Sequence, residues 1–279
     1  MKGAMEWFRA IVAVLDSIIT ESEREAMASF ILEDFSVSRN SVLLNIPAKI
    51  DINRLQKIIS RINNGEPLQY ILEYAWFYNR KFKVSPAVLI PRPETELLVD
   101  QILGFSGKDS ELVMLDLGTG SGIIPVTISI QRPSWKIYAT DISTEALEMA
   151  KQNAVESGAN INWLCSDMLS MVPEVASGVD VLVSNPPYIS IQEKDTLQRQ
   201  VIDFEPHLAL FASDTDPLNF YRAISRIGKK LLKPKGCILA EVNVQYAGEV
   251  LEIFNQDGFL NGQVIADLDG KPRIVRIDS

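Results

Sequence analysis

The tetrapeptide Asn185-Pro186-Pro187-Tyr188 contains the residue types in this chain that point most directly to chemistry. It follows a continuous apolar run, 179–184, that is typical of a buried strand. The side-chain oxygen of Asn185 and the carbonyl oxygen of Pro186 are two acceptors on a stiff backbone, because proline fixes φ and has no competing N–H. Together they can accept both hydrogens of a planar –NH2 group, on which the ring of Tyr188 could stack. Alternatively, the two prolines only end the strand and begin a turn.

A glycine-rich segment from Asp116 to Gly122 has the sequence D-L-G-T-G-S-G and follows a predicted strand over 112–117. Alternate glycines let a backbone turn sharply and approach a ligand, and the helix that follows presents free N–H groups at its positive dipole end. The G-x-G-x-G spacing differs from the dinucleotide fingerprint G-x-G-x-x-G, and no Lys-Ser or Lys-Thr pair follows to make a P-loop. A ligand with an amino-acid moiety therefore fits better than a pyrophosphate. The predicted cofactor loop is Gly118, Thr119, Gly120, Ser121 and Gly122.

Two more predicted strands end in residues that suit a nucleoside. Asp141 ends the second strand, about 20 residues past the glycines, where an acid can accept hydrogen bonds from ribose hydroxyls. Its alternative role is to cap the next helix, which Ser143 could do instead. Met168 follows the third strand and is placed to line an adenine ring, or alternatively fills the core.

Predicted helices and strands alternate from about residue 94 onward and would position these loops. The helices are predicted over 94–103, 123–130, 144–156, 218–232 and 246–256, and the strands over 112–117, 136–140, 161–165, 179–184 and 237–242. Continuous apolar runs are typical of strands covered on both faces. The pattern predicts an α/β fold with a doubly wound, mostly parallel sheet. The tail, 262–277, is typical of a hairpin with Asp269-Gly270 in its turn.

The first part of the chain has a different pattern. Residues 1–65 carry apolar side chains at three- and four-residue spacing, which predicts a small helical bundle. The sequence N-N-G-E-P at 63–67 breaks that pattern, and a hairpin is predicted after it, turning near Asn79-Arg80. We therefore divide the chain into a helical domain at 1–65, a linker and β-hairpin at 66–90, and an α/β domain at 91–279.

The 279-residue chain has a formal net charge of −9, which argues against general affinity for a phosphate backbone and favours a basic protein partner. We expect no direct nucleic-acid binding. Two cysteines and a single histidine give no zinc-binding pattern, so no metal site is expected and both thiols are predicted to be buried. The N-terminus has no signal-peptide pattern and no apolar run is long enough to span a membrane, which predicts a cytoplasmic protein.

These features resemble S-adenosylmethionine-dependent methyltransferases of the Rossmann-like class, and N-P-P-Y resembles the motif of the amino-methyltransferases in it. The segments 66–72, 88–99, 183–189 and 204–210, in this order, are similar to those of the HemK/PrmC family, the peptide chain release factor glutamine methyltransferases. The resemblance covers nearly the whole chain. It implies a Rossmann-like methyltransferase catalytic domain at 91–279 and a small N-terminal helical domain that docks the protein substrate, or alternatively caps the sheet.

The resemblance also implies the reaction and its residues. S-adenosyl-L-methionine would donate a methyl group to the side-chain amide nitrogen of the glutamine in the Gly-Gly-Gln loop of a release factor. The catalytic positions are matched by Asn185, Pro186 and Tyr188, and the glutamine-binding motif by these three together with Pro187. The cofactor-binding positions are matched by Gly118, Thr119, Gly120, Ser121, Gly122, Asp141, Met168 and Asn185.

Five other residues either match or depart from positions of the family pattern outside the two motifs. Arg92 and Thr95 lie near the cofactor in relatives, but a surface charge and a helix cap are their alternatives, so neither is assigned to the site. Glu73, Pro217 and Asn243 depart from the residues usual in the family. The departures spare both motifs and bear on the surface that contacts the protein substrate.

An amide nitrogen is a poor nucleophile because its lone pair is delocalised, so we expect the chemistry to depend on positioning and electrostatics without a general base. One alternative is an amino-methyltransferase that acts on an exocyclic nucleobase amine, which would need a flipped base and a basic groove. A second is a methyltransferase whose glutamine substrate lies in a ribosomal protein. A third is a non-catalytic binder that keeps the fold.

Overall fold

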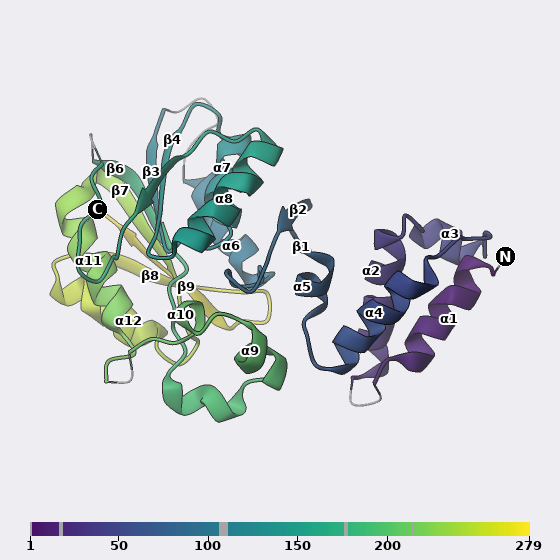
Figure 1. Ribbon diagram of the computed structural model, residues 1–279. Coiled ribbons are helices and arrows are strands. Elements are labelled where there is room, and N and C mark those ends of the chain that lie inside the picture. The colour runs from purple at the N-terminus through teal and green to yellow at the C-terminus, as the bar shows by residue number, and fades with distance from the viewer. Residues whose placement is uncertain (1, 17–18, 106–110, 176–177, 214) are drawn as a thin grey trace. The chain divides into compact units, whose positions relative to one another are not determined.

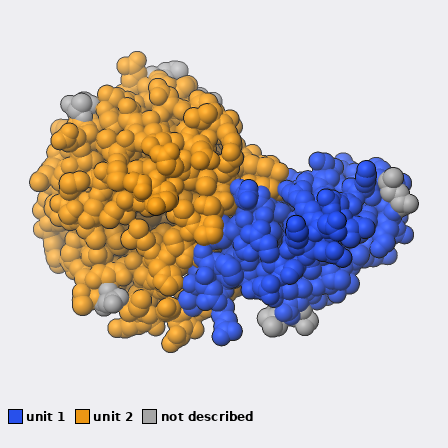
Figure 2. Space-filling model, viewed as in Figure 1, with its two compact units in different colours: residues 1–73, 199–204 blue, residues 74–198, 205–279 orange. Residues whose placement is uncertain are grey.

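The computed structural model describes residues 2–16, 19–105, 111–175, 178–213 and 215–279 (Figure 1). The chain forms two compact units, one of residues 1–73 with 199–204 and one of residues 74–198 with 205–279 (Figure 2). The region expected to be a linker and hairpin, 66–90, contains a short helix, α5 (Leu68–Leu72), in the first unit and the paired strands β1 (Tyr74–Phe77) and β2 (Arg80–Lys83) in the second.

The first unit is built from helices. Besides α5 it contains α1 (Ala4–Val14), α2 (Glu21–Asp34), α3 (Arg39–Leu43), α4 (Ile52–Asn63) and α9 (Arg199–Phe204). Apolar side chains from α1, α2 and α4 share one core, in which Ile11, Ile31 and Ile58 are buried. Thr20 and Glu23 form a capping box that satisfies free N–H groups at the start of α2.

The second unit is organised by a seven-stranded sheet with the strand order β5-β4-β3-β6-β7-β9-β8. Its strands are β3 (Val113–Leu117), β4 (Lys136–Asp141), β5 (Asn162–Cys165), β6 (Val179–Ser184), β7 (Leu232–Glu241), β8 (Asn261–Ala266) and β9 (Pro272–Asp278). The first five are parallel, and the terminal hairpin of β8 and β9 joins them in antiparallel pairing. The doubly wound α/β fold and the terminal hairpin are therefore confirmed.

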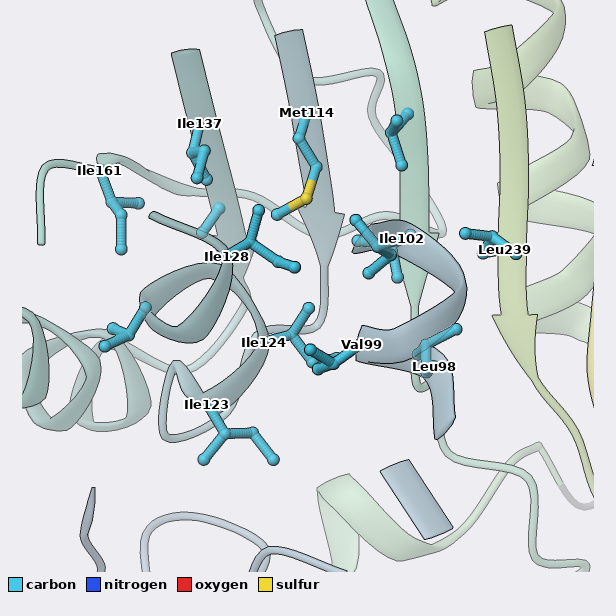
Figure 3. Close-up of a cluster of buried hydrophobic side chains, with 14 of the residues drawn as sticks. Leu98, Val99, Ile102, Met114, Ile123, Ile124, Ile128, Ile137, Ile161 and Leu239 are labelled. Atoms are coloured by element: carbon cyan, nitrogen blue, oxygen red, sulfur yellow. The ribbon is translucent and has the colours of Figure 1, made fainter. Parts of the chain in front are cut away.

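Helices cover both faces of this sheet. Those of the second unit are α6 (Glu94–Gly104), α7 (Ile123–Gln131), α8 (Thr144–Ser157), α10 (His207–Leu210), α11 (Asn219–Leu231) and α12 (Ala247–Gln256), with a 3-10 helix, η1 (Ile191–Thr196). On one face, Ile102 of α6 and Ile128 of α7 pack with Met114 of β3 (Figure 3). On the other, Tyr221 of α11 and Phe254 of α12 belong to a second core. Among the helices of the described ranges, none is long and apolar enough to cross a membrane.

Three local features differ from expectation. The β1–β2 hairpin turns at Tyr78 and Asn79, both at positive φ, one residue earlier than predicted. Strand β7 begins five residues before the predicted start, with a register shift against β6 and Lys235 at φ +67°. Cys165 is exposed, because it lies on β5 at the edge of the sheet, whereas Cys237 on β7 is buried as predicted.

The last glycine of the G-x-G-x-G segment connects the loop after β3 to helix α7. Gly122 is the residue before the helix and has φ +79°, a conformation that side chains rarely adopt. A Cβ at this position would also lie 3.0 Å from the Cβ of Ala150 on α8. Both the conformation and the close approach to α8 therefore require glycine.

We expect Gly122→Ala to lower the free energy of unfolding by about 2 kcal/mol, because the new methyl group meets both backbone strain and Ala150. Gly248→Ala is the matched control, since Gly248 is an exposed position in α12 with open space around it. There the same change should raise stability by about 0.5–1 kcal/mol. Urea denaturation of both variants measures the difference, and equal effects would contradict the steric argument.

Candidate active site

The end of β3 and the end of β6 are joined by a buried hydrogen bond. The hydroxyl of Ser184 donates to the carbonyl oxygen of Leu117 at 2.7 Å, at a position where the two strands are in parallel register. The next residues along the chain are Asn185 and Gly118. The tetrapeptide and the glycine loop therefore leave the sheet at adjacent points of the same edge.

A cavity of about 350 Å³ opens at this edge. Strands β4 and β5 follow on one side of β3, and strands β6 and β7 follow on its other side. The cavity therefore lies at the topological switch point, where α/β sheets usually bind ligands. The predicted site residues that line it are Gly118, Thr119, Gly120, Ser121, Asp141, Met168, Asn185 and Pro187. Of the described residues predicted for the site, Gly122, Pro186 and Tyr188 do not line it.

Asp141 holds the glycine loop in place from the neighbouring strand. Its carboxylate accepts hydrogen bonds from the backbone N–H groups of Gly120 at 2.8 Å and Ser143 at 2.9 Å. Burial raises the pKa of Asp141, and these backbone donors oppose the rise. Ser143 provides the N-cap of α8 through a hydrogen bond from the N–H of Ala146, so Asp141 does not cap that helix.

The buried side chain of Asn153 also holds the glycine loop in place. Asn153 of α8 donates through Nδ2 to the carbonyl oxygens of Ser121 at 2.9 Å and Lys83 at 3.0 Å, and it accepts from the N–H of Lys83 at 2.7 Å. The β1–β2 hairpin is thereby tied to the cofactor loop. The sequence gives little sign of this role, because Asn153 is one of several polar residues in an amphipathic helix.

Met168 combines the two roles considered for it. It lines the cavity and also belongs to the buried core on the α11–α12 face of the sheet. Its Cε lies 3.2 Å from the point that a Cβ on Gly118 would occupy. A side chain at position 118 would therefore displace Met168 from the cavity wall.

Asp116 is a candidate site residue that the sequence argument did not select. It is fully buried at the end of β3, and neither of its carboxylate oxygens meets hydrogen-bond geometry with any described residue. Burial raises the pKa of Asp116 to about 7, which the nearby Thr119 hydroxyl opposes and the charge of Asp141 reinforces. A buried carboxylate without a partner is costly unless a donor or cation reaches it. Its position directly before the glycine loop was the available signal.

Two side chains of the tetrapeptide belong to a second polar cluster. Asn185 donates through Nδ2 to Oγ1 of Thr95 at 3.1 Å, and that hydroxyl donates to Oε2 of Glu241 at 2.8 Å. The hydroxyl of Tyr188 donates to Oε1 of the same carboxylate at 3.4 Å. Asn185 and Tyr188, three residues apart, are thus both connected to Glu241 at the end of β7.

The electrostatics of this cluster are set mainly by burial. Burial raises the pKa of Glu241 to about 7, while the hydrogen bonds from Thr95 and Tyr188 lower it. The pKa of Tyr188 is raised by burial and by the charge of Glu241. The signal for Glu241 in the sequence is an acid inside a continuous apolar run, C-I-L-A-E-V, at the end of a strand.

Arg92 and Thr95, which were left unassigned, both line the cavity. Arg92 forms an ion pair with Glu205, a buried acid that also accepts a hydrogen bond from the N–H of Ile90 at 3.2 Å. The P-R-P-E-T-E stretch is therefore anchored to the segment before α10. Among the described residues, no cluster of three or more acidic, histidine or cysteine side chains could hold a metal ion.

Comparison with known proteins agrees with this architecture. A family model described as "Methyltransferase small domain" matches residues 93–208. The fold is similar to that of a methyltransferase from Pyrococcus furiosus, with a TM-score of 0.53 and 16% identity over 78% of this chain and 95% of that one. The fold is thus Rossmann-like, and the matched segment has the sequence pattern of a methyltransferase domain.

Curated relatives narrow the class to one family. The release factor glutamine methyltransferase of Bacteroides thetaiotaomicron is 42% identical over 79% of each chain. That of Flavobacterium psychrophilum is 34% identical over 96% of each chain. The chain belongs to the release factor glutamine methyltransferase family, as its motifs predicted.

The cavity has the properties that S-adenosyl-L-methionine requires. The glycine loop permits close approach of a ligand, since nothing lies within 4 Å of the point that a Cβ on Gly120 would occupy. The carboxylate of Asp141 lines the cavity and can accept hydrogen bonds from a ribose, whereas Asp116 is fully buried and does not line the cavity. The residues present therefore fit the cofactor of this class of enzyme.

The raised pKa of Asp116 predicts a pH dependence of stability in the ligand-free protein. Between about pH 4 and pH 7 the folded protein keeps a proton that the unfolded carboxyl has released, so this group makes stability fall as pH rises. Asp116→Asn removes that contribution. Its free energy of unfolding should exceed that of the wild type by on the order of 2 kcal/mol at pH 8 and differ little at pH 4.

Urea denaturation at the two pH values measures this effect, with Asp269→Asn in the exposed terminal hairpin turn as the control. Calorimetry on the same proteins should show weaker binding of S-adenosyl-L-methionine to Asp116→Asn alone. A stability difference that does not change with pH would contradict the assignment of the raised pKa to Asp116.

Proposed function

We propose that this protein transfers a methyl group from S-adenosyl-L-methionine to the side-chain amide nitrogen of the glutamine in the Gly-Gly-Gln motif of a peptide chain release factor. One observation carries the proposal. Asn185 lines the cavity beside the cofactor loop, and its Nδ2 is already engaged by Thr95. No hydrogen bond from a described residue reaches its Oδ1, which is therefore available to accept from a carboxamide –NH2 group.

The residues of the chain would act mainly by binding and orientation. Oδ1 of Asn185 and the carbonyl oxygen of Pro186 accept the two hydrogens of the substrate amide, which fixes its plane and draws electron density toward nitrogen. Pro187 lines the cavity, whereas Tyr188, which does not line it, holds the tetrapeptide through its hydrogen bond to Glu241. When bound, the cofactor supplies an electrophilic methyl group on a positively charged sulfur.

Other residues that line the same cavity would bind the cofactor. The backbone of Gly118 to Gly122 and the carboxylate of Asp141 bind the amino-acid and ribose parts, Met168 lies against the base, and Asp116, which does not line the cavity, contributes its charge. This assignment is supported by the hydrogen bond that orders the loop and by the burial of Asp116. A general base is not required, because the methylated amide can lose its proton readily.

The helical first unit is the proposed docking surface for the protein substrate. Its exposed apolar side chains include Leu43, Leu44 and Ile46, of which Leu44 is 74% exposed. With a net charge of −9, the chain suits a basic protein surface better than nucleic acid, so we infer no direct nucleic-acid binding. Two free cysteines agree with a reducing compartment, which supports a cytoplasmic location.

Mass spectrometry tests the substrate directly. Purified protein is incubated with S-adenosyl-L-methionine and, in separate reactions, a release factor, ribosomal proteins and DNA or RNA. We expect one methyl group on the Gly-Gly-Gln glutamine and none in the other reactions, because the chain belongs to the release factor glutamine methyltransferase family. Methylation of a ribosomal protein or of a nucleobase amine, with the release factor unmodified, would replace this function by one of its alternatives.

Removal of the acceptor tests the role of Asn185. Asn185→Ala should reduce methyl transfer at least about 100-fold, because the substrate amide loses one of its two fixed acceptors. Binding of S-adenosyl-L-methionine should remain measurable by calorimetry. Asn261→Ala, an exposed asparagine on β8, is the control and should keep full turnover. Unchanged turnover of Asn185→Ala would refute the assigned role.

A further inference from the structure

The polar chain that begins at Asn185 continues into the protein away from the substrate. It passes from Asn185 after β6 to Thr95 in the first turn of α6, and ends on Glu241 at the end of β7. Thr95 and Glu241 are 1% and 2% exposed. Water therefore does not compete for these hydrogen bonds, and the choice of donor and acceptor at each step is decided by the three side chains.

The direction of the hydrogen bonds in this chain decides which end of the Asn185 amide faces the cavity. Oδ1 and Nδ2 have nearly the same shape, so an asparagine is oriented by its partners rather than by its volume. The Thr95 hydroxyl has one hydrogen, and an ionised Glu241 can only accept it. Thr95 must then accept from Asn185, which places Nδ2 toward Thr95 and leaves Oδ1 for a substrate.

The opposite arrangement would disable the site proposed above. A neutral, hydrogen-donating group at position 241 could donate to Thr95, whose own hydrogen would then bond Oδ1 of Asn185. The –NH2 group of Asn185 would face the –NH2 group of the substrate glutamine, and two donors cannot form a hydrogen bond. An ionised carboxylate at position 241 thus excludes the wrong orientation of Asn185, although the two side chains are not in contact.

We propose that Glu241 and Thr95 are positioning residues: the Glu241 carboxylate, acting through the Thr95 hydroxyl, fixes Asn185 with its oxygen toward the amide of the substrate. The inference rests on the proposed function and adds two residues to it. Tyr188 donates to the second oxygen of Glu241, so the same carboxylate holds both ends of the tetrapeptide.

The hydrogen bonds of Glu241 come from hydroxyl groups, and the nearby charged residues act on it only through their charges. Glu94 and Arg273 act on it only through their charges and in opposite directions. Arg273 is paired with Asp267 at 2.7 Å and lies 3.7 Å from Glu94. Among the ion pairs of the described residues none includes Glu241. The hydrogen bonds from Thr95 and Tyr188 oppose the rise that burial causes in the pKa of Glu241, so its ionised form predominates above about pH 7.

Three substitutions test the chain of hydrogen bonds. Glu241→Gln keeps the shape but introduces a donor, Thr95→Val removes the hydroxyl, and Thr95→Ser keeps it. On a release factor that the wild type methylates, the first two should lower kcat about 100-fold with little change in KM, because the protein substrate still docks. Thr95→Ser should restore near wild-type kcat. Glu249→Gln, an exposed glutamate on α12, is the control.

A double substitution separates positioning from independent structural roles. If Thr95 and Glu241 act only through Asn185, the combined Thr95→Val and Glu241→Gln variant should lose no more activity than either single variant. Multiplied losses, or weaker cofactor binding by calorimetry in step with lost stability, would mean that the two residues support the fold instead. Full kcat in both Glu241→Gln and Thr95→Val would overturn the proposal outright.

The orientation of Asn185 can also be measured without methyl transfer. In the nitrogen-15 NMR spectrum of the ligand-free protein, the side-chain amide signal of Asn185 is identified by its absence from Asn185→Ala. It should move on Thr95→Val and stay in place on Thr95→Ser, since only the former removes the partner of Nδ2. A wild type that modifies no release factor would refute the proposed function, whereas an unmoved signal in Thr95→Val would refute the orientation of Asn185.

Discussion

The site depends on one buried contact, the hydrogen bond by which the Ser184 hydroxyl joins the carbonyl oxygen of Leu117. It closes the parallel pairing of β6 with β3 at the last residue of each strand. The glycine loop and the tetrapeptide come immediately after this contact, and Asp116 lies one residue before it. The glycine loop and the tetrapeptide are thus held at a spacing set by the sheet, which is more rigid than any loop-to-loop contact.

Around that contact the protein buries more carboxyl groups than stability alone would favour. Asp116, Asp141 and Glu241 end three neighbouring parts of the same sheet edge, and burial raises the pKa of each. Each has a different use. Asp141 orders backbone N–H groups, Glu241 accepts hydroxyls that orient other side chains, and Asp116 is left without a described partner. Acids with perturbed pKa values often cluster at functional sites, which agrees with the cavity at this edge.

The sequence was sufficient for the fold and for part of the cavity wall, since eight of the predicted site residues line it. Continuous apolar runs predicted the parallel strands, and G-x-G-x-G with an acid at Asp141 predicted the cofactor loop. The contribution of Thr95 and Glu241 could not be found in the same way. Their contact spans 146 positions and exists only because α6 and β7 both lie next to the end of β6, an arrangement that no local pattern encodes.

The remaining differences have local physical causes. Tyr78 and Asn79 both adopt positive φ, so the hairpin turns at a residue that turn statistics disfavour. Cys165 is exposed because its strand lies at an edge, and strand order cannot be read from the apolar content of a single strand. Pro186 and Tyr188 illustrate the limit of a motif. Their types were recognised, but whether they face the ligand depends on a backbone direction that residue types do not fix.

The position of β9 has a consequence for synthesis. Residues 272–278 lie between β7 and β8, so the strand nearest the C-terminus is an inner strand of the sheet. While the chain is still being made on the ribosome, β8 has no neighbour to pair with and the edge of β7 stays open. The nascent chain therefore presents an unpaired strand edge beside Glu241 until residues 272–278 emerge, and misassembly can begin at this open edge.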